Sequence, residues 1–455
     1  MIADLKAYPQ YRDAGLPWTG PVPAHWKTER AKWLFTKMDR AVRPSDEVVT
    51  CFRDGTVTLR RNRRLRGFTE AIFESGYQGI RRGDFVIHAM DAFAGAVGVS
   101  DSDGKGTPVY SVCRPRQGAD PHYFAHIVRQ MAHSHWILAL AKGIRERSTD
   151  FRFETFGNQR VPLPPPQEQA AIVRFLAWAT ANIDRAIGAK RKVIDLLNER
   201  KQAVIHRAVT QGLDASVPTR DSGVPWIGRI PEHWTLTPNR AFLGIRKVLV
   251  GARHGEYRLL SLTKTGIIVR DMDAGGKFSN FWDRSQEVRP GDLVFCLFDV
   301  EETPRTVGLS KHHGMISGDY TVMECADLGI AEWVENFYKA MDDRKLLSPL
   351  YSGLRKRIPK PEFLSISTPF PPMAEMLEIG QHVEASLVST DRSIARINRE
   401  VRLLAEYRMR LVADVVTGKL DVREAAAHLP DESSLERDSD SIAADGDVSD
   451  EESAA

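Results

Sequence analysis

Asp13-Ala-Gly-Leu-Pro-Trp-Thr-Gly-Pro-Val-Pro-Ala-His-Trp26 recurs later in the chain as Asp221-Ser-Gly-Val-Pro-Trp-Ile-Gly-Arg-Ile-Pro-Glu-His-Trp234. The two stretches lie 208 positions apart and share eight of their fourteen residues. A second match follows at the same offset, Gly83–Val86 with Gly291–Val294. An internal repeat of this length indicates a duplicated structural module. We therefore expect two globular units that share one topology.

Each copy is followed by a segment typical of one long helix. Between Gln167 and Thr210 there is no proline and only one glycine, Gly188, so a helix of about 44 residues and roughly 66 Å is expected. Apolar residues recur there at spacings of three and four, and the pattern returns 207 positions later. A stripe of this length needs a partner helix, which the other copy supplies; docking of each helix on its own globular unit is the alternative. The predicted helix-pair seam comprises Ile172, Leu176, Ile183, Ile187, Ile194, Leu197, Val204, Ile379, Val383, Ile394, Ile397, Val401, Leu404, Leu411 and Val415.

The segments outside these helices have short β-type runs such as Phe85–Ile87 and Leu293–Phe295, with helices expected at Pro121–Ala141 and Ala331–Met341. The predicted class is α+β: two similar α/β domains separated by two long antiparallel coiled-coil helices, with internal pseudo-two-fold symmetry. The predicted organisation is a first domain at 1–166, a central helix at 167–211, a second domain at 212–372, a C-terminal helix at 373–420 and an acidic disordered tail at 421–455.

Charge is divided unevenly along the chain. Residues 430–455 carry ten Asp or Glu and one Arg, so this tail contributes −9 to the total of +3 and leaves +12 on residues 1–429. A basic body of this kind favours a polyanionic partner such as nucleic acid. The four scattered cysteines indicate reduced thiols in a cytoplasmic protein, and no apolar run is long enough to span a membrane.

Signatures of catalysis are missing from the sequence. No Gly-x-Gly-x-x-Gly follows a strand, and the proline clusters at 162–166 and 369–372 lack the flanking residues of an adenine methyltransferase motif. The histidine pairs have no carboxylate or thiol at metal-ligand spacing. Asp84 and Asp292 each follow a glycine before a strand, where we expect a turn-capping role. We expect no catalytic, cofactor-binding or metal-binding residue in this chain.

Basic loops remain as candidates for contacts with DNA. Five arginines fall between Leu59 and Gly67, and arginine forks match both phosphate oxygens and guanine O6/N7. A solvated run of charges is the alternative for this cluster, and a structural ion pair is the alternative for the arginines that precede each proline cluster. The full set of candidates is Arg60, Arg61, Arg63, Arg64, Arg66, Lys105, Arg145, Arg147, Lys264, Arg270, Lys277, Arg305, Lys311, Arg355 and Arg357.

Three motifs together resemble the specificity subunit of a type I restriction–modification system, over about residues 10–421. They are the repeated Gly-x-Pro-Trp-x-Gly-x-x-Pro-x-His-Trp stretch, the helix start at Pro165-Pro166-Gln167-Glu168-Gln169 and the helix end at Val209–Asp214. The second helix start, Pro371-Pro372-Met373-Ala374-Glu375, lacks the Glu-Gln pair of the first. We therefore expect the two helix starts to differ.

The resemblance implies two target-recognition domains that read a bipartite double-stranded DNA site, with the antiparallel helices as the ruler between them. It further implies two methyltransferase subunits and motor–nuclease restriction subunits as partners, which would supply adenine methylation and cleavage. S-adenosylmethionine, ATP and Mg then belong to those partners, and this chain is non-catalytic. A coiled-coil scaffold for proteins alone and an autonomous DNA-modifying enzyme are the alternatives.

Overall fold

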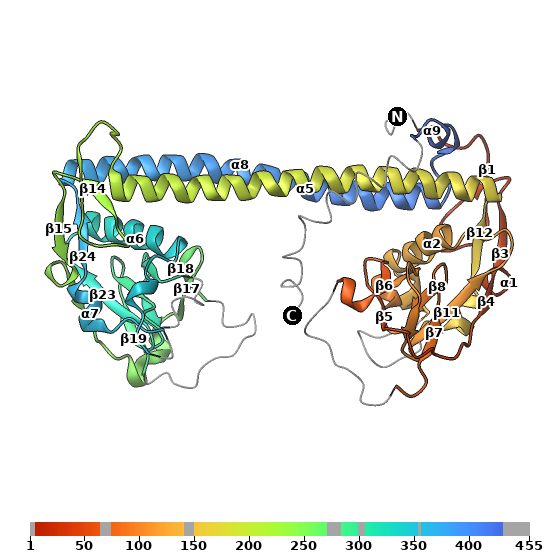
Figure 1. The fold of residues 1–455 in the computed structure, drawn as a ribbon, viewed down its shortest axis with the longest axis horizontal. Helices are drawn as coiled ribbons and strands as arrows, with labels where there is room; N and C mark the ends of the chain where they lie inside the picture. Colours follow the sequence, from red (N-terminus) through yellow and green to blue (C-terminus); the bar gives the residue numbers. More distant parts are fainter. Residues whose placement is uncertain are drawn as a thin grey trace. The chain divides into compact units, whose positions relative to one another are not determined.

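The computed structural model describes residues 5–63, 74–140, 150–270, 284–298, 305–353 and 356–430. Helices and strands alternate through these ranges, which confirms the predicted α+β class. The chain divides into two compact units, Met1–Ala189 with Glu400–Ala455, and Lys190–Arg399. We call them the first unit and the second unit. Each contains its own sheets and short helices together with part of both long helices (Figure 1).

The first unit is built on an antiparallel sheet with strand order β4-β11-β8-β9. Helix α2 packs against β8 and β9, and the rings of Phe35, Phe85 and Phe124 meet in the core. Smaller antiparallel pairs join β5 with β6, β7 with β10, β3 with β12 and β1 with β2. The bounds are β1 Tyr11–Arg12, β2 Val22–Pro23, β3 Lys27–Arg30, α1 Ala31–Leu34, β4 Phe35–Lys37, β5 Val49–Cys51, β6 Val57–Leu59, η2 Arg60–Asn62, β7 Gln78–Ile80, β8 Phe85–His88, η3 Ala92–Ala94, β9 Val97–Val99, β10 Gly104–Gly106, β11 Tyr110–Pro115, α2 Pro121–His133, α3 Trp136–Ala139, α4 Phe153–Gly157 and β12 Arg160–Leu163.

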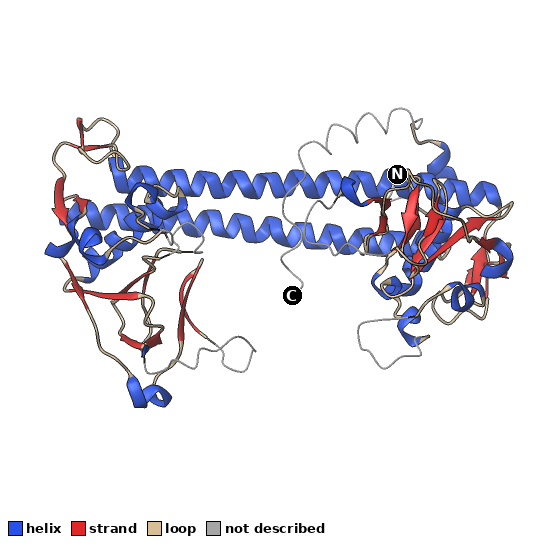
Figure 2. Ribbon diagram, turned by 60° about the horizontal axis from the view of Figure 1, so that its bottom comes forward, coloured by secondary structure: helices blue, strands red, loops and turns tan. Residues whose placement is uncertain are grey.

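The second unit repeats this plan, with strand order β16-β23-β20-β21. Helix α6 packs against β21 and β23, and the rings of Phe295, Phe337 and Tyr338 meet in the core. Figure 2 colours the strands of both units red. The bounds are β13 Thr219–Asp221, β14 Arg229–Pro231, β15 Thr235–Pro238, η4 Asn239–Ala241, β16 Leu243–Ile245, η5 Gly251–Glu256, β17 Leu260–Thr263, β18 Gly266–Val269, β19 Gln286–Val288, β20 Leu293–Phe295, β21 Val307–Leu309, β22 Gly314–Ile316, β23 Thr321–Cys325, α6 Leu328–Asp343, η7 Ser348–Leu350, α7 Lys360–Ser365 and β24 Ser367–Phe370.

One predicted helix is interrupted. The segment Pro121–Ala141 was expected to form one helix, but α2 ends at His133 and a separate turn, α3, begins at Trp136. His135 between them has φ of +58°, a left-handed conformation that no α-helix interior allows. The predicted helix at Ala331–Met341 lies inside the longer α6.

The two long helices are α5, Pro166–Gln211, and α8, Met373–Val416. The glycines that follow them, Gly212 and Gly418, have φ of +75° and +77°, the left-handed geometry that commonly ends a helix. Helix α8 therefore stops four residues before the predicted end at 420, because the chain turns at Gly418 and Lys419 N–H donates back to Asp414 O.

Within each unit the two helices run in opposite directions. In the first unit the side chains of Ile172 and Leu176 from α5 share one core with Val415 from α8, and Asp184 pairs with Arg408 at 2.5 Å. In the second unit the side chains of Ile205 and Val209 share a core with Ile379 and Val383, and Lys201 pairs with Asp391 at 2.7 Å. Residues late in α5 thus meet residues early in α8. Every residue of the predicted seam is buried or half-buried.

The chain after α8 continues as ordered structure beyond the predicted start of the tail. Val422, Ala426 and Leu429 are buried in the first unit's core, and helix α9 spans Arg423–Ala427. The Arg174 guanidinium donates to the carbonyls of Leu429 at 2.8 Å and Pro430 at 3.0 Å. The tail predicted at 421–455 therefore differs from the structure at its first ten residues, while 431–455 lie outside the described residues.

Candidate nucleic-acid interface

The predicted arginine cluster of the first unit begins directly after the β-hairpin that β5 and β6 form. Arg60 follows β6, and its backbone N–H donates to Val48 O at 2.8 Å. Beside the hairpin, the backbone N–H of Lys105 in β10 donates to Glu47 O at 2.8 Å. We call β5, β6 and β10 the hairpin frame of the first unit. Two of the predicted basic residues thus lie on one frame.

The second unit has the same frame, made of β17, β18 and β22. Here the Arg270 N–H donates to Leu259 O and the Met315 N–H donates to Arg258 O, both at 2.8 Å. These backbone bonds show which positions of the two frames correspond. Arg270 and Leu259 of the second unit stand where the first unit has Arg60 and Val48. Met315 and Arg258 stand where it has Lys105 and Glu47. Arg60 and Arg270, which the sequence places in loops with no visible relation, therefore occupy equivalent positions in the two units.

Several cations of the first unit's frame are held by carboxylates. Arg61 pairs with Glu47 at 2.7 Å, Arg63 with Asp54 at 2.5 Å, and Lys105 with Glu74 at 2.6 Å. Burial alone would raise the pKa of Asp54, but hydrogen bonds from Thr56 and Arg63 outweigh it and lower that pKa. The side chains of Arg61 and Glu47 are 62% and 50% exposed, and pairs this exposed contribute at most about 1 kcal/mol. A phosphate group can therefore replace such a partner at little cost.

The second unit's candidates have diverse surroundings. Arg305 has a structural role, because its guanidinium contacts Asp343 and donates to Lys264 O at 3.1 Å. Its side chain is only 20% exposed, which leaves little of it for a ligand. Lys264 lies in the exposed turn between β17 and β18, Lys311 is exposed, and Arg270 lines a pocket together with Arg258 and Met315.

The remaining candidates fall mostly outside the described residues. Arg357 is described and exposed, in an isolated bridge with Ser352. The DNA contacts predicted for the arginines before each proline cluster, and the structural ion pair that is their alternative, therefore stay predictions. Those outside the described ranges are Arg64, Arg66, Arg145, Arg147, Lys277 and Arg355.

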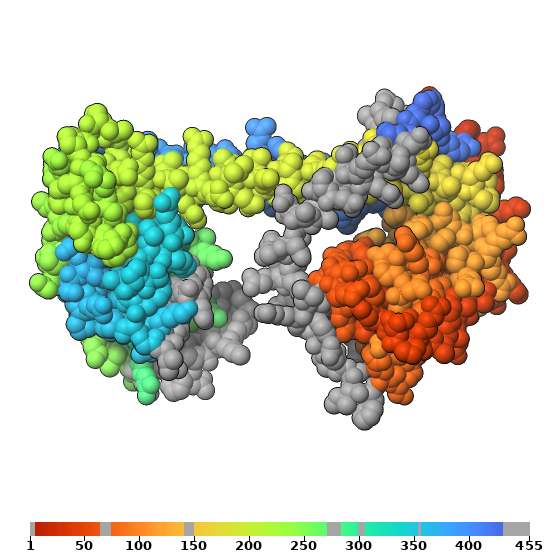
Figure 3. Space-filling model, in the orientation of Figure 1, coloured from red at the N-terminus to blue at the C-terminus, as the bar shows by residue number. Residues whose placement is uncertain are grey.

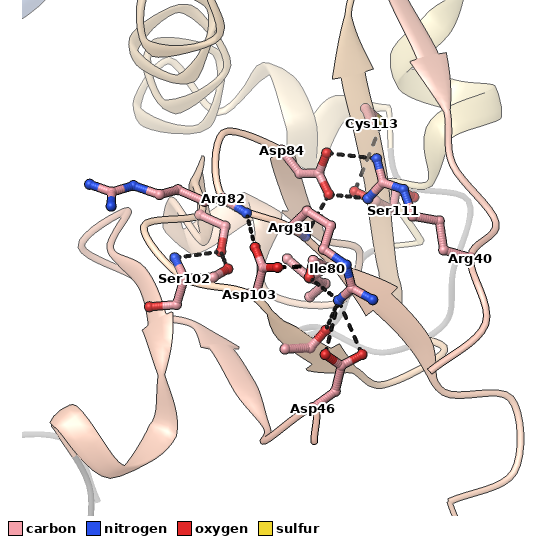
Figure 4. Close-up of polar contacts among 12 residues, drawn as sticks. Arg40, Asp46, Ile80, Arg81, Arg82, Asp84, Ser102, Asp103, Ser111 and Cys113 are labelled. Atoms are coloured by element: carbon pink, nitrogen blue, oxygen red, sulfur yellow. Dashed lines mark hydrogen bonds and ion pairs between the residues drawn. The ribbon is translucent and has the colours of Figure 1, made fainter. Parts of the chain in front are cut away.

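The predicted turn-capping role of the two aspartates agrees with the geometry. Asp84 accepts from the Arg81 backbone N–H at 2.7 Å and from the guanidinium of Arg40, as Figure 4 shows. The same figure shows the Arg81 guanidinium between both oxygens of Asp46, at 3.1 Å each. These contacts fix the turn that leads from β7 into β8.

The equivalent aspartate of the second unit makes the same two contacts. Asp292 accepts from the Arg289 backbone N–H at 2.8 Å and pairs with Arg246 at 3.1 Å. Burial raises the pKa of Asp292, and the hydrogen bond from Arg289 and the charge of Arg246 partly offset this rise. Both carboxylates therefore stabilise the turn that leads into the central sheet of their unit.

The repeated His-Trp dipeptide has a carboxylate partner that the sequence patterns did not indicate. Glu168, near the start of α5, accepts from the Trp26 indole N–H at 2.8 Å and from the Tyr8 hydroxyl, and its other oxygen lies 2.8 Å from His25 Nε2. Burial, together with the hydrogen bond to Glu168, raises the pKa of Tyr8, so the hydroxyl keeps its proton and remains a donor. This carboxylate fastens the first repeat to the helix that follows it.

The same contact exists in the second unit. Glu375 accepts from the Trp234 indole N–H at 3.1 Å, and its other oxygen lies 2.7 Å from His233 Nε2. The second helix start thus keeps the glutamate and differs in having Met376 where the first has Gln169. The second start therefore lacks the Glu-Gln pair and differs from the first, as expected, but it keeps the glutamate of that pair: the helices correspond at an offset of 207, which aligns Glu375 with Glu168.

Within the described ranges there is neither a group of three metal-ligating side chains nor a helix apolar enough over 18 residues to cross a membrane.

Comparisons with known proteins agree with the motif resemblance. No family model matches the chain. The MjaVIII type I restriction enzyme specificity subunit of Methanocaldococcus jannaschii is 23% identical over 59% of this chain and 64% of its own length. The EcoKI specificity subunit of Escherichia coli K12 is 24% identical over 42% of this chain and 44% of its own length. The match thus spans less than two thirds of either relative.

A solved structure shares the fold. It comes from work described as the structural basis of complex assembly and conformational transition of the type I R-M system. That chain superposes with a TM-score of 0.57 at 15% identity, and the match covers 88% of this chain and 99% of the solved one. The resemblance carried by the repeated motif and the helix ends is therefore confirmed: the curated relatives of this chain are specificity subunits of type I restriction enzymes, and the solved chain that shares its fold comes from work on a type I R-M system.

Proposed function

We propose that this chain is the sequence-specific DNA-binding specificity subunit of a type I restriction–modification complex. Each unit would read one half of a bipartite double-stranded site, and partner subunits would methylate adenine and cleave. The observation that carries this proposal is the hairpin frame, which occurs twice in the same backbone register with different side chains. One scaffold with two sets of surface residues is what the recognition of two unlike half-sites requires.

Exposed cations on the frames supply the means of binding a duplex. Arg61 and Arg63 in the first unit, and Lys264 in the second, stand on or directly beside the hairpin. Contacts with phosphates would position each unit, and a few side chains would select bases. A scaffold that binds only proteins would show no salt-dependent affinity for DNA, whereas several phosphate contacts make that affinity fall steeply with salt.

The long helices are proposed as the ruler between half-sites. Each continues without a break through both units, and the interhelical ion pairs recur at the repeat offset of 207: Asp184 corresponds to Asp391, and Lys201 to Arg408. Such matched pairing supports an antiparallel arrangement with approximate two-fold symmetry. The half-sites would then be read in opposite orientations, with untouched bases between them.

The outer faces of the same helices suit the docking of two partner subunits. Leu196 of α5 is 56% exposed and Leu403 of α8 is 54% exposed, and these leucines are equivalent in the repeat. Figure 3 shows the middle of α5 with its side chains uncovered. Exposed leucines at matching places favour two copies of one protein, which we propose to be the methyltransferase subunit. S-adenosylmethionine, ATP and Mg would be bound by the methyltransferase and the motor–nuclease subunits.

Methylation mapping tests this proposal. Adenine methylation across a genome should follow one bipartite motif when this chain is expressed with its methyltransferase partner, and should vanish when this chain is deleted. Methylation that persists unchanged without this chain would contradict the proposal. Modification of DNA by the purified chain alone with added cofactor would instead favour an autonomous enzyme.

A further inference from the structure

A pocket of about 300 Å³ opens beside the hairpin frame of the second unit. It lies among η5, the residues just before β17, the end of β18 and β22. Leu259, Val269 and Met315 give it an apolar part, while Tyr257, Arg258 and Arg270 give it an aromatic ring and two guanidinium groups. No carboxylate is among the described residues that line it. An apolar hollow with guanidinium donors is suited to a ligand that presents hydrogen-bond acceptors beside a flat apolar surface.

The first unit has opposite charges at the corresponding place. The register of the two frames sets Tyr257 and Arg258 at the positions of Asp46 and Glu47. In the first unit these two carboxylates are engaged, Asp46 with Arg81 at 3.1 Å and Glu47 with Arg61 at 2.7 Å. At these two equivalent positions, the acidic pair of the first unit is thus replaced by a tyrosine and an arginine in the second unit.

Aromatic and cationic neighbours surround the Tyr257 ring of the pocket, whereas the Arg258 side chain has no partner among the described residues. The Tyr257 ring lies 5.3 Å from the ring of His313, and the Arg253 guanidinium stands 5.9 Å from the Tyr257 ring centre. The Arg258 side chain is exposed, and it has no hydrogen bond or ion pair with any described residue. A guanidinium beside an aromatic ring, without a carboxylate to neutralise it, is poised to donate hydrogen bonds to acceptor atoms of a ligand.

We propose that this pocket is a specificity-determining subsite that reads a guanine in the half-site of the second unit. The Arg258 fork donates to guanine O6 and N7 in the major groove, and the apolar part of the pocket receives the edge of the neighbouring base pair. In the first unit Glu47 stands at the place of Arg258 and holds Arg61, so that unit makes no guanine contact from this position. This assignment rests on the proposed function and gives a physical reason for the two half-sites to differ.

The test uses the chain in complex with its methyltransferase partner and a set of duplexes in which each base pair of the second half-site is replaced in turn. The Arg258→Ala variant should lose discrimination at one guanine position by about 5- to 150-fold, the range of one bidentate contact. Its preferences elsewhere in that half-site and throughout the first half-site should remain.

Two further variants separate base reading from other roles. Arg258→Lys keeps the charge and can still donate to guanine acceptors, but without the planar fork, so it should retain only part of this discrimination while retaining nonspecific affinity. Arg240→Ala, which removes an exposed cation of the same unit outside the pocket and outside the set of candidates for DNA contact, should leave every preference unchanged. Thermal melting of each variant checks that the second unit stays folded.

Other results overturn the inference. If Arg258→Ala weakens binding to all duplexes equally and Arg258→Lys restores it, the guanidinium contacts a phosphate and selects no base. If 2-aminopurine in the half-site becomes strongly fluorescent with the unaltered chain but not with Arg258→Ala, the pocket holds an extruded base rather than a paired one. If the unaltered complex shows no preference at any position, the proposed function itself fails, which is a different outcome from a loss confined to one base pair.

Discussion

Replacing Glu168 with alanine should destabilise the first unit more than the equivalent replacement of Glu375 destabilises the second. The Glu168 side chain is 4% exposed and accepts from two buried donors, the Tyr8 hydroxyl and the Trp26 indole. A buried donor that loses its partner costs about 1–3 kcal/mol, so the expected loss is about 2–6 kcal/mol. His25 is 43% exposed, and water can replace its contact.

The equivalent site provides the comparison. The Glu375 side chain is 26% exposed, and Trp234 is its one buried donor among the described residues. Water can reach this site more easily, so Glu375→Ala should cost toward the lower end of about 1–3 kcal/mol. Glu154→Ala is the matched control in the first unit, because the 3.2 Å pair of Glu154 with Lys37 is 67% and 50% exposed and worth less than about 1 kcal/mol.

The assay follows urea unfolding of the full chain by tryptophan fluorescence and assigns each transition by hydrogen exchange. In Glu168→Ala, amides of β8 and β11 should lose protection while those of β20 and β23 in the second unit keep it. The reasoning is refuted if Glu168→Ala costs no more than Glu154→Ala, or if Glu375→Ala costs more than Glu168→Ala.

Three further predictions follow from the described contacts. Gly418→Ala should lower the free energy of unfolding more than Gly212→Ala does. Both glycines have φ near +75°, but a Cβ at Gly418 would lie 2.4 Å from Pro23 Cδ, whereas at Gly212 the nearest atom is a flexible Glu375 oxygen at 3.0 Å. Equal losses of unfolding free energy would contradict this. Asp184→Arg should destabilise the helix pair by placing two cations together, and adding Arg408→Asp should restore stability in a double-mutant cycle; an absence of coupling would mean that the pair is not formed in solution. Arg61→Ala and Arg63→Ala should each lower DNA affinity equally for all sequences and reduce the slope of log affinity against log salt by about 1, as measured by titration at several salt concentrations; an unchanged slope would remove these residues from the interface.

The repeat and the helical periodicity predicted the largest features of the fold. Because a side-chain pattern repeated over hundreds of residues reflects a repeated backbone, the match between Gly83–Val86 and Gly291–Val294 predicted two sheets of one strand order. The seam positions were predictable because burial along a helix follows its periodicity. The break at His135 was not, since its left-handed conformation leaves no mark in the pattern of apolar residues.

Contacts between distant residues were beyond the reach of sequence patterns. The arginine cluster was visible as a run of charge, but its partners Glu47 and Asp54 could be identified only once the hairpin brought them close. Arg305 looked like a candidate for DNA because Asp343, its partner, lies 38 positions further along the chain. The correspondence of Glu375 with Glu168 was available in the sequence, since the seam itself fixed the helix offset at 207.

The correspondence of Arg258 with Glu47 could not be found in the same way. The offset between the copies drifts from 208 at the first repeat to 211 at these residues, and the sequence around them is not shared. Only the backbone hydrogen bonds of the two frames set them in register. The residues that distinguish the two units are therefore those that sequence comparison of the copies aligns least well.

The length of the untouched spacer between half-sites tests the ruler most directly. Seven residues of matching seam pattern would be inserted after Ala189 in α5 and after Arg399 in α8, at the boundaries of the two units, so that the Asp184–Arg408 and Lys201–Asp391 pairs are preserved. Each helix lengthens by about 10 Å, the rise of up to about three base pairs. Genome-wide methylation mapping should then yield both original half-sites with a longer spacer, and methylation of the original motif with its spacer unchanged would contradict the account.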